Sequence, residues 1–90
     1  MSCAAPSQRY YGSLRISGTV TRSGRPVRGY VRLLDDAGEF VAELPTDKEG
    51  TFTFFAAPGA WTLRLLTSEG TTDVPVVLGD EDAPHVALTL

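Results

Sequence analysis

A chain of 90 residues is long enough for one small domain and too short for two. Acidic residues outnumber basic residues by 11 to 8, and the net charge of −3 argues against nucleic acid or an anionic membrane as a partner. The single cysteine, Cys3, excludes an intrachain disulfide and favours a reducing compartment. No apolar run resembles a signal peptide or a membrane helix, so we expect a cytoplasmic protein.

Residues 1–13 show no regular period, and we expect a flexible N-terminal arm before a domain over residues 14–90. From there on, apolar and polar residues alternate in short stretches between Gly, Pro and Asp turns, with no helical stretch. The alternation predicts seven strands, over residues 14–21, 27–34, 40–44, 51–55, 61–65, 74–78 and 86–90. Such a pattern is typical of an antiparallel β-sandwich with Greek-key connections.

The strongest alternation lies on either side of Pro58-Gly59. We expect the runs 51–55 and 61–65 to pair as a hairpin across this turn, with Trp61 in the core. Proline lacks the amide that a central strand needs, so Pro45 indicates a sheet edge or a strand end and Pro75 indicates an edge or a bulge.

Four segments in this order carry a resemblance to a known fold: Gly18 to Val20, Gly24 to Asp35, Thr46 to Phe54 and Pro58 to Leu65. They resemble the carboxypeptidase regulatory-like, transthyretin-related sandwich domain. The resemblance implies the fold and no particular activity, because such modules are usually non-catalytic appendages or carriers.

The chain also resembles, over nearly its whole length, a family of small actinobacterial proteins of unknown function. This second resemblance rests on a cysteine near a proline at the N-terminus and on the segments Tyr30 to Asp35, Glu39-Phe40 and Phe52 to Arg64. Members of that family are commonly encoded beside a thiosulfate sulfurtransferase. The resemblance therefore implies an accessory role in sulfur metabolism.

Cys3 is the one candidate for covalent chemistry. An exposed thiol beside a cationic amino terminus can form a reactive thiolate, which would accept a sulfane sulfur as a persulfide. The alternative is an incidental free thiol on a flexible tail.

No catalytic constellation emerges from the remaining residues, and we expect no enzyme activity and no cofactor. His85 is the only histidine, and no motif supplies it with a nucleophile or an orienting group. Three acidic turns, at 35–39, 47–49 and 80–82, lack the spacing of a calcium loop. We therefore expect solvated turns and no metal site.

Some apolar residues fall out of phase with the inward residues of their strands, and alternation places them on outer faces. They are Tyr30, Leu34, Phe55 and Leu66. If they cluster, they mark a homodimer or partner interface; alternatively, twists or bulges near strand ends bury them in part. Four arginines also point outward, either as an anion-binding face or as solvated strand faces, namely Arg15, Arg28, Arg32 and Arg64.

The sequence thus predicts a non-catalytic interaction module that docks through this apolar face and presents the Cys3 arm to a sulfurtransferase or another protein. Two alternatives stay open. In one, the domain is a sulfur acceptor through a persulfide on Cys3. In the other, it is a transthyretin-like dimer that binds a small molecule.

Overall fold

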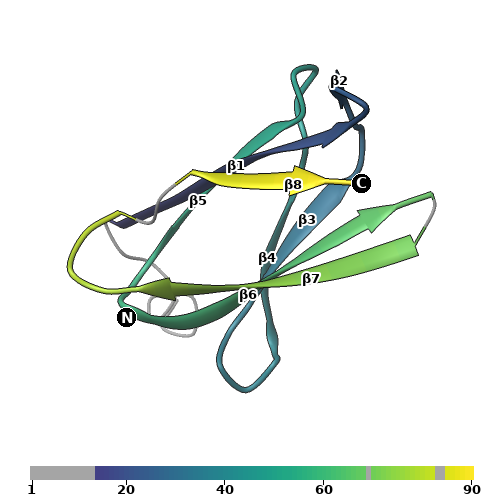
Figure 1. The fold of residues 1–90 in the computed structure, drawn as a ribbon. Helices are drawn as coiled ribbons and strands as arrows, with labels where there is room; N and C mark the ends of the chain where they lie inside the picture. Colours follow the sequence, from purple (N-terminus) through teal and green to yellow (C-terminus); the bar gives the residue numbers. More distant parts are fainter. Residues whose placement is uncertain (1–13, 69, 83–84) are drawn as a thin grey trace, which may run out of the picture.

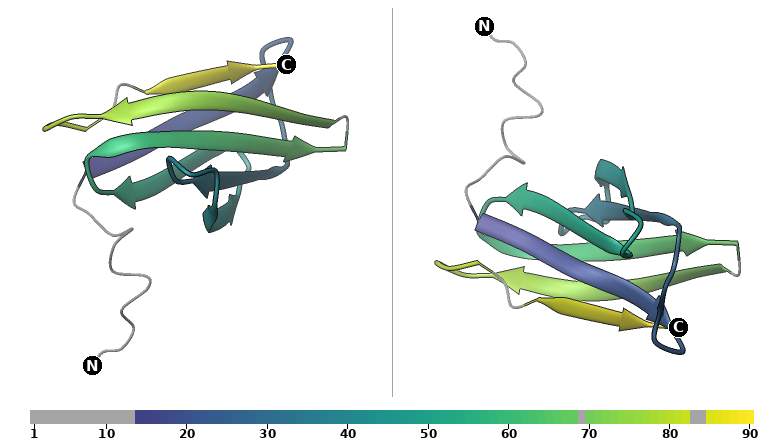
Figure 2. Two further views of the ribbon diagram at one scale, coloured as in Figure 1. Left: turned by 90° about the horizontal axis from the view of Figure 1, so that it is seen from below. Right: turned by 90° about the horizontal axis from the view of Figure 1, so that it is seen from above.

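A computed structural model of the chain describes residues 14–68, 70–82 and 85–90. The arm expected over residues 1–13, including Cys3, lies outside the described residues. The described chain is built from strands and turns, arranged as two sheets packed face to face (Figures 1 and 2). The predicted all-β sandwich is confirmed. The described residues contain no helix that could cross a membrane.

The two sheets share the strands equally. In the first, sheet A, β1 (Leu14–Arg22) pairs antiparallel with β2 (Arg25–Pro26) and β5 (Thr51–Ala56), and parallel with β8 (Val86–Thr89). The second, sheet B, is antiparallel throughout and has the order β4-β3-β6-β7. Its strands are β4 (Phe40–Pro45), β3 (Tyr30–Leu34), β6 (Gly59–Thr67) and β7 (Gly70–Leu78).

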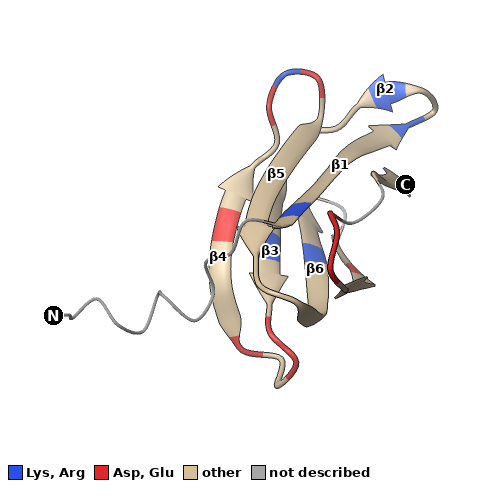
Figure 3. Ribbon diagram, turned by 90° about the vertical axis from the view of Figure 1, so that its left-hand side faces the viewer, with Lys and Arg blue, Asp and Glu red and all other residues tan. Residues whose placement is uncertain are grey.

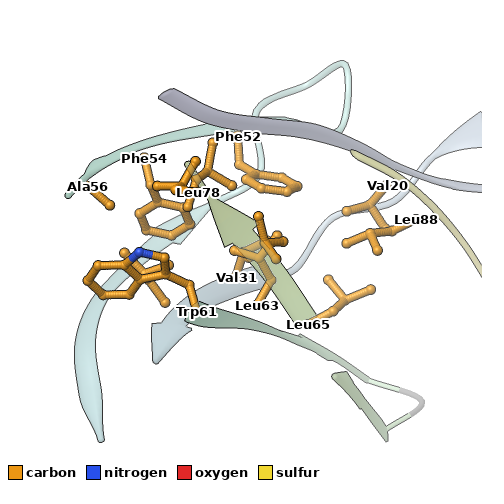
Figure 4. Close-up of a cluster of buried hydrophobic side chains, with 13 residues drawn as sticks. Val20, Val31, Phe52, Phe54, Ala56, Trp61, Leu63, Leu65, Leu78 and Leu88 are labelled. Carbon is orange, nitrogen blue, oxygen red and sulfur yellow. The ribbon is translucent and has the colours of Figure 1, made fainter. Parts of the chain in front are cut away.

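One apolar core fills the space between the sheets (Figure 4). Alternate residues of the paired strands point inward, as period two requires. The largest fully buried side chains are Ile16, Val20, Val31, Leu33, Leu63 and Leu65. Trp61 is buried beside them, which confirms its predicted place in the core.

The predicted hairpin across Pro58-Gly59 is wrong. β5 pairs with β1, whereas β6 pairs with β3 and β7, so the chain crosses from sheet A to sheet B between them. The indole Nε1 of Trp61 donates a hydrogen bond of 2.9 Å to the carbonyl oxygen of Ala57 and fastens this crossing. Alternation could not separate the two arrangements, because each of them points Phe54 and Trp61 into the same core.

A second crossing shortens the strand predicted over 27–34, which begins at Tyr30. Thr46, just after β4, holds the crossing: its Oγ1 donates to the carbonyl of Val27 over 2.9 Å and accepts from the amide of Gly29 over 3.0 Å. The amide of Thr46 also donates to the carbonyl of Gly29 over 2.9 Å. The segment 27–29 is thereby fixed against the end of β4.

The prolines occupy the expected places. Pro45 ends β4 and Pro75 lies in β7, and these two strands are the edges of sheet B. Because an edge strand can do without one ladder donor, both predictions are confirmed.

Gly18 lies where β1 passes closest to its neighbours. A Cβ at this position would lie 2.5 Å from the ring of Phe52 and 2.6 Å from the carbonyl oxygen of Val86. We expect Gly18→Ala to lower the free energy of unfolding by about 1–3 kcal/mol, because the backbone of β8 and a packed ring would have to move.

The matched control is Gly79→Ala, since Gly79 has open space around its Cα. Chemical denaturation should show a change of less than about 0.5 kcal/mol for this control. Equal stability losses in the two variants would contradict the close approach at Gly18.

Candidate binding surface

Leu34 does not lie on an outer face, contrary to the sequence-based expectation. Its side chain is 5% exposed, and Leu33 beside it is also buried. The register between β3 and β4 shifts between these two residues, which is the mark of a bulge. A bulge breaks the alternation, so two consecutive residues turn toward the interior.

The other three predicted interface residues are divided between the sheets. Tyr30 and Leu66 are directly opposite each other on β3 and β6 in sheet B. Phe55 belongs to β5 in sheet A, where it pairs with Arg15, and the Arg15 guanidinium lies 5.9 Å from its ring centroid. The four residues therefore do not form one face, and only Tyr30 and Leu66 of the set come together.

A row of charges crosses the outer face of sheet B in the order Glu43, Arg32, Arg64, Asp73. Arg32 Nε lies 2.6 Å from Glu43 Oε1, and Arg64 donates to both oxygens of Asp73 over 2.9 and 3.0 Å. Hydrogen bonding from Arg64 lowers the pKa of Asp73. Since each arginine has its own carboxylate, the row is a balanced strand face and not a free anion site.

A different group of arginines lies at the end of β1. Arg22 and Arg25 face each other across the β1-β2 turn, in which Ser23 and Gly24 have φ of 52° and 78°. Two successive positive φ values define the tight hairpin turn that matches strand twist. Like charges directly opposite each other are unfavourable. The hairpin places these two arginines at one end of the sandwich, beside the turn at 47–50 that joins β4 to β5 (Figure 3).

Arg28 joins this group from the crossing segment that Thr46 holds. A depression of about 280 Å³ is lined by Arg22, Arg25, Pro26, Val27, Arg28, Thr67 and Ser68. A second, of about 390 Å³, is lined by Arg28, Gly29, Tyr30, Leu66, Thr67 and Ser68. Because the two depressions share three residues, they form one continuous surface, which we call the Arg28 surface.

The Arg28 surface combines charge with apolar area. Neither Arg25 nor Arg28 forms an ion pair with any residue that the structure describes. Tyr30 is 52% exposed next to Leu66. Sequence reasoning found Arg28, Tyr30 and Leu66 but missed Arg22 and Arg25. The spacing of the arginines at 22, 25 and 28 is a signal that could have located them.

The remaining candidate residues have structural roles. His85 Nε2 lies 2.8 Å from the Thr19 hydroxyl on the exposed side of sheet A, and none of the described residues forms a hydrogen bond or ion pair that orients the other ring nitrogen. Arg15 donates its backbone amide to Asp82 over 2.7 Å. Among the residues that the structure describes, no three His, Cys, Asp or Glu side chains gather as a metal site.

In two of the acidic turns, one aspartate oxygen accepts hydrogen bonds from two backbone amides. The Oδ1 of Asp35 accepts the amides of Ala37 and Glu39, each over 2.9 Å. The Oδ1 of Asp47 accepts the amides of Glu49 and Thr51 over the same distance. Asp35 is buried, contrary to the expectation of a fully solvated turn. These carboxylates act as turn-forming acceptors, which is a sufficient reason for their presence.

Known proteins resemble this chain over most of its length. The model of the family described as "Protein of unknown function (DUF1416)" matches residues 3–90. The chain belongs to this family. An uncharacterized protein of Mycolicibacterium smegmatis is 52% identical over 58 residues, which cover 63% of this chain and 64% of that protein.

Two uncharacterized proteins of Mycobacterium tuberculosis, Rv0814c and Rv3118, are each 50% identical over 58 residues. The matched part covers 63% of this chain and 58% of each relative. The chain thus spans about three-fifths of the length of the relatives that it matches. The resemblance to actinobacterial proteins of unknown function is confirmed at this level.

The Asp47 turn should make stability depend on pH. Hydrogen bonds from the Thr51 hydroxyl and from the amides of Thr51 and Glu49 lower the pKa of Asp47. Because the folded state binds this proton more weakly than the unfolded state, the contribution is present above about pH 4. It is lost as the pH falls through the lowered pKa.

We therefore expect Asp47→Asn to be less stable than the parent at pH 7 and to lose less stability on acidification. Asp36→Asn is the control, since none of the described residues forms a hydrogen bond with the Asp36 side chain. Urea denaturation between pH 7 and pH 2.5 measures the difference. An identical acid dependence in parent and Asp47→Asn would refute the assignment.

Proposed function

We propose that this chain is a non-catalytic interaction module whose Arg28 surface binds an acidic segment of a protein partner. The observation that carries the proposal is the placement of Arg25 and Arg28, which have no carboxylate partner among the described residues, beside the exposed Tyr30 and the half-buried Leu66. The chain as a whole has a net charge of −3, so these two arginines stand out against an acidic background.

Charge complementarity defines the chemistry of the partner. A guanidinium binds a carboxylate through two parallel hydrogen bonds, which gives orientation as well as affinity. The hydroxyls of Thr67 and Ser68 line the same depressions and supply further polar contacts. Tyrosine and arginine are also the side chains most often found at the energetic centres of interfaces. An acidic segment that carries an apolar residue would match both halves of the surface.

The resemblance to proteins encoded beside thiosulfate sulfurtransferases supports a role in sulfur metabolism and makes such an enzyme the first partner to test. Of the predicted docking residues, Tyr30 and Leu66 remain part of this proposal. Leu34 is excluded by its burial, and Phe55 by its place on the other sheet.

The arginines should decide the affinity. In a titration of the fluorescently labelled protein with the thiosulfate sulfurtransferase of the same organism, we expect Arg25→Ala/Arg28→Ala to weaken binding at least about tenfold. The reason is that two charge-assisted hydrogen-bonding groups are lost. Affinity should also fall as salt rises, because exposed charges are screened.

The control is Arg15→Ala, which removes one positive charge at the far end of β1 in sheet A and is compared with the single variants Arg25→Ala and Arg28→Ala. An equal loss in this variant would show that net charge acts and not the Arg28 surface. Binding unchanged in the double variant would overturn the proposed surface.

The alternative function, sulfur transfer to Cys3, is supported by a family match that includes this residue. Incubation with thiosulfate and the sulfurtransferase would then add one sulfur, about 32 Da, by intact mass, because a thiolate accepts sulfane sulfur as a persulfide. The Cys3→Ser variant should gain nothing. No gain in the parent while the enzyme turns over would eliminate this alternative. The transthyretin-like dimer that binds a small molecule stays a prediction.

A further inference from the structure

We propose that β5 is a dimerisation strand, which pairs antiparallel with β5 of a second copy of the chain. The two copies would be related by a two-fold axis, and their sheets A would join into one continuous sheet. This inference rests on backbone geometry and is independent of the Arg28 surface.

Among the edge strands of the described sheets, β5 is the one of six or more residues that contains neither a proline nor a charged residue, the features that prevent an edge from pairing with another chain. β4 ends in Pro45, β7 contains Pro75, and β8 is four residues long. By contrast, β5 has the sequence Thr-Phe-Thr-Phe-Phe-Ala, with no charge, proline or glycine. Natural proteins usually blunt such edges, because an open, uncharged edge with high strand propensity pairs with another strand.

The direction of the backbone groups of β5 follows from its first residues. The carbonyl of Gly50 accepts from the amide of Val20 and so points toward β1. The amide and carbonyl of Thr51 both bond to Asp47, on the opposite side. Alternate residues of a strand repeat these directions. The amides and carbonyls of Thr53 and Phe55 therefore point to the outer edge of β5, where the described part of the chain adds no further strand to sheet A.

A second copy satisfies these four groups in one register. When Thr53 lies opposite Phe55 of the partner subunit, and Phe55 opposite the partner's Thr53, both pairs exchange two hydrogen bonds, four in all. A shift by one pair would bring Phe55 opposite the partner's Thr51, whose backbone groups already bond to Asp47. The turn at 47–50 thus disfavours this shift. The opposite shift would bring Thr53 opposite the partner's Ala57, whose carbonyl oxygen already accepts from the Trp61 indole.

The side chains agree with this pairing. Phe55 is 50% exposed on the outer face of sheet A, and in the proposed register its ring would lie beside the methyl group of the partner's Thr53. Aromatic and β-branched residues form favourable cross-strand pairs. Because β5 carries no charge, the two-fold axis brings no like charges together.

Sedimentation equilibrium of the whole chain tests the dimer. We expect self-association with a dissociation constant below about 1 mM, weakened at least tenfold by Thr53→Lys and by Phe55→Lys. Val77→Lys is the matched control, because Val77 is exposed on the opposite edge strand, β7, and should leave association unchanged. A monomeric parent at millimolar concentration, or lysine variants that associate like the parent, would overturn the proposal.

The register can be tested without lysine substitutions, by oxidation in a Cys3→Ser background. A mixture of Thr53→Cys protein and Phe55→Cys protein should form a disulfide-linked dimer faster than either protein alone, because hydrogen-bonded pairs lie within disulfide reach. Equal rates in the mixture and in the separate proteins would refute the register.

Discussion

The hydrogen bonds of Thr46 hold together the two places where the chain passes between its sheets near β4. Its hydroxyl and amide fix the crossing segment 27–29 through Val27 and Gly29, and the next residue, Asp47, forms the turn that leads into β5. The dipeptide Thr46-Asp47 therefore determines where β3 and β5 begin. Both the position of Arg28 and the free edge of β5 depend on it.

Several acidic side chains of this protein form local contacts. Asp35 and Asp47 direct their carboxylates at backbone amides of their own turns, while Glu43 and Asp73 neutralise the arginines of sheet B. Negative charge is thus used locally, at turns and on one sheet face. Arg25 and Arg28 form no ion pair with any of the described residues, so their charges are left for solvent or a partner.

Alternation predicted which strands exist and which residues point inward, because a half-buried strand has a strict period of two. It could not predict strand partners: Phe54 and Trp61 face the same core whether their strands form a hairpin or belong to opposite sheets. Nor could it place Leu34, because one bulge reverses the phase. The Arg28 surface was found only in part, since Arg22 and Arg25 join Arg28 through a tight turn and a crossing.

The two proposed surfaces bind through different interactions and consist of different residues. The Arg28 surface acts through side-chain charge and exposed apolar area, whereas the β5 edge acts through backbone groups that sheet A leaves open. The residues of one are not shared with the other, so both can be occupied at once. A two-fold pair through β5 would carry two copies of the Arg28 surface. Any partner that is itself dimeric would then bind more tightly through effective concentration, without a new contact.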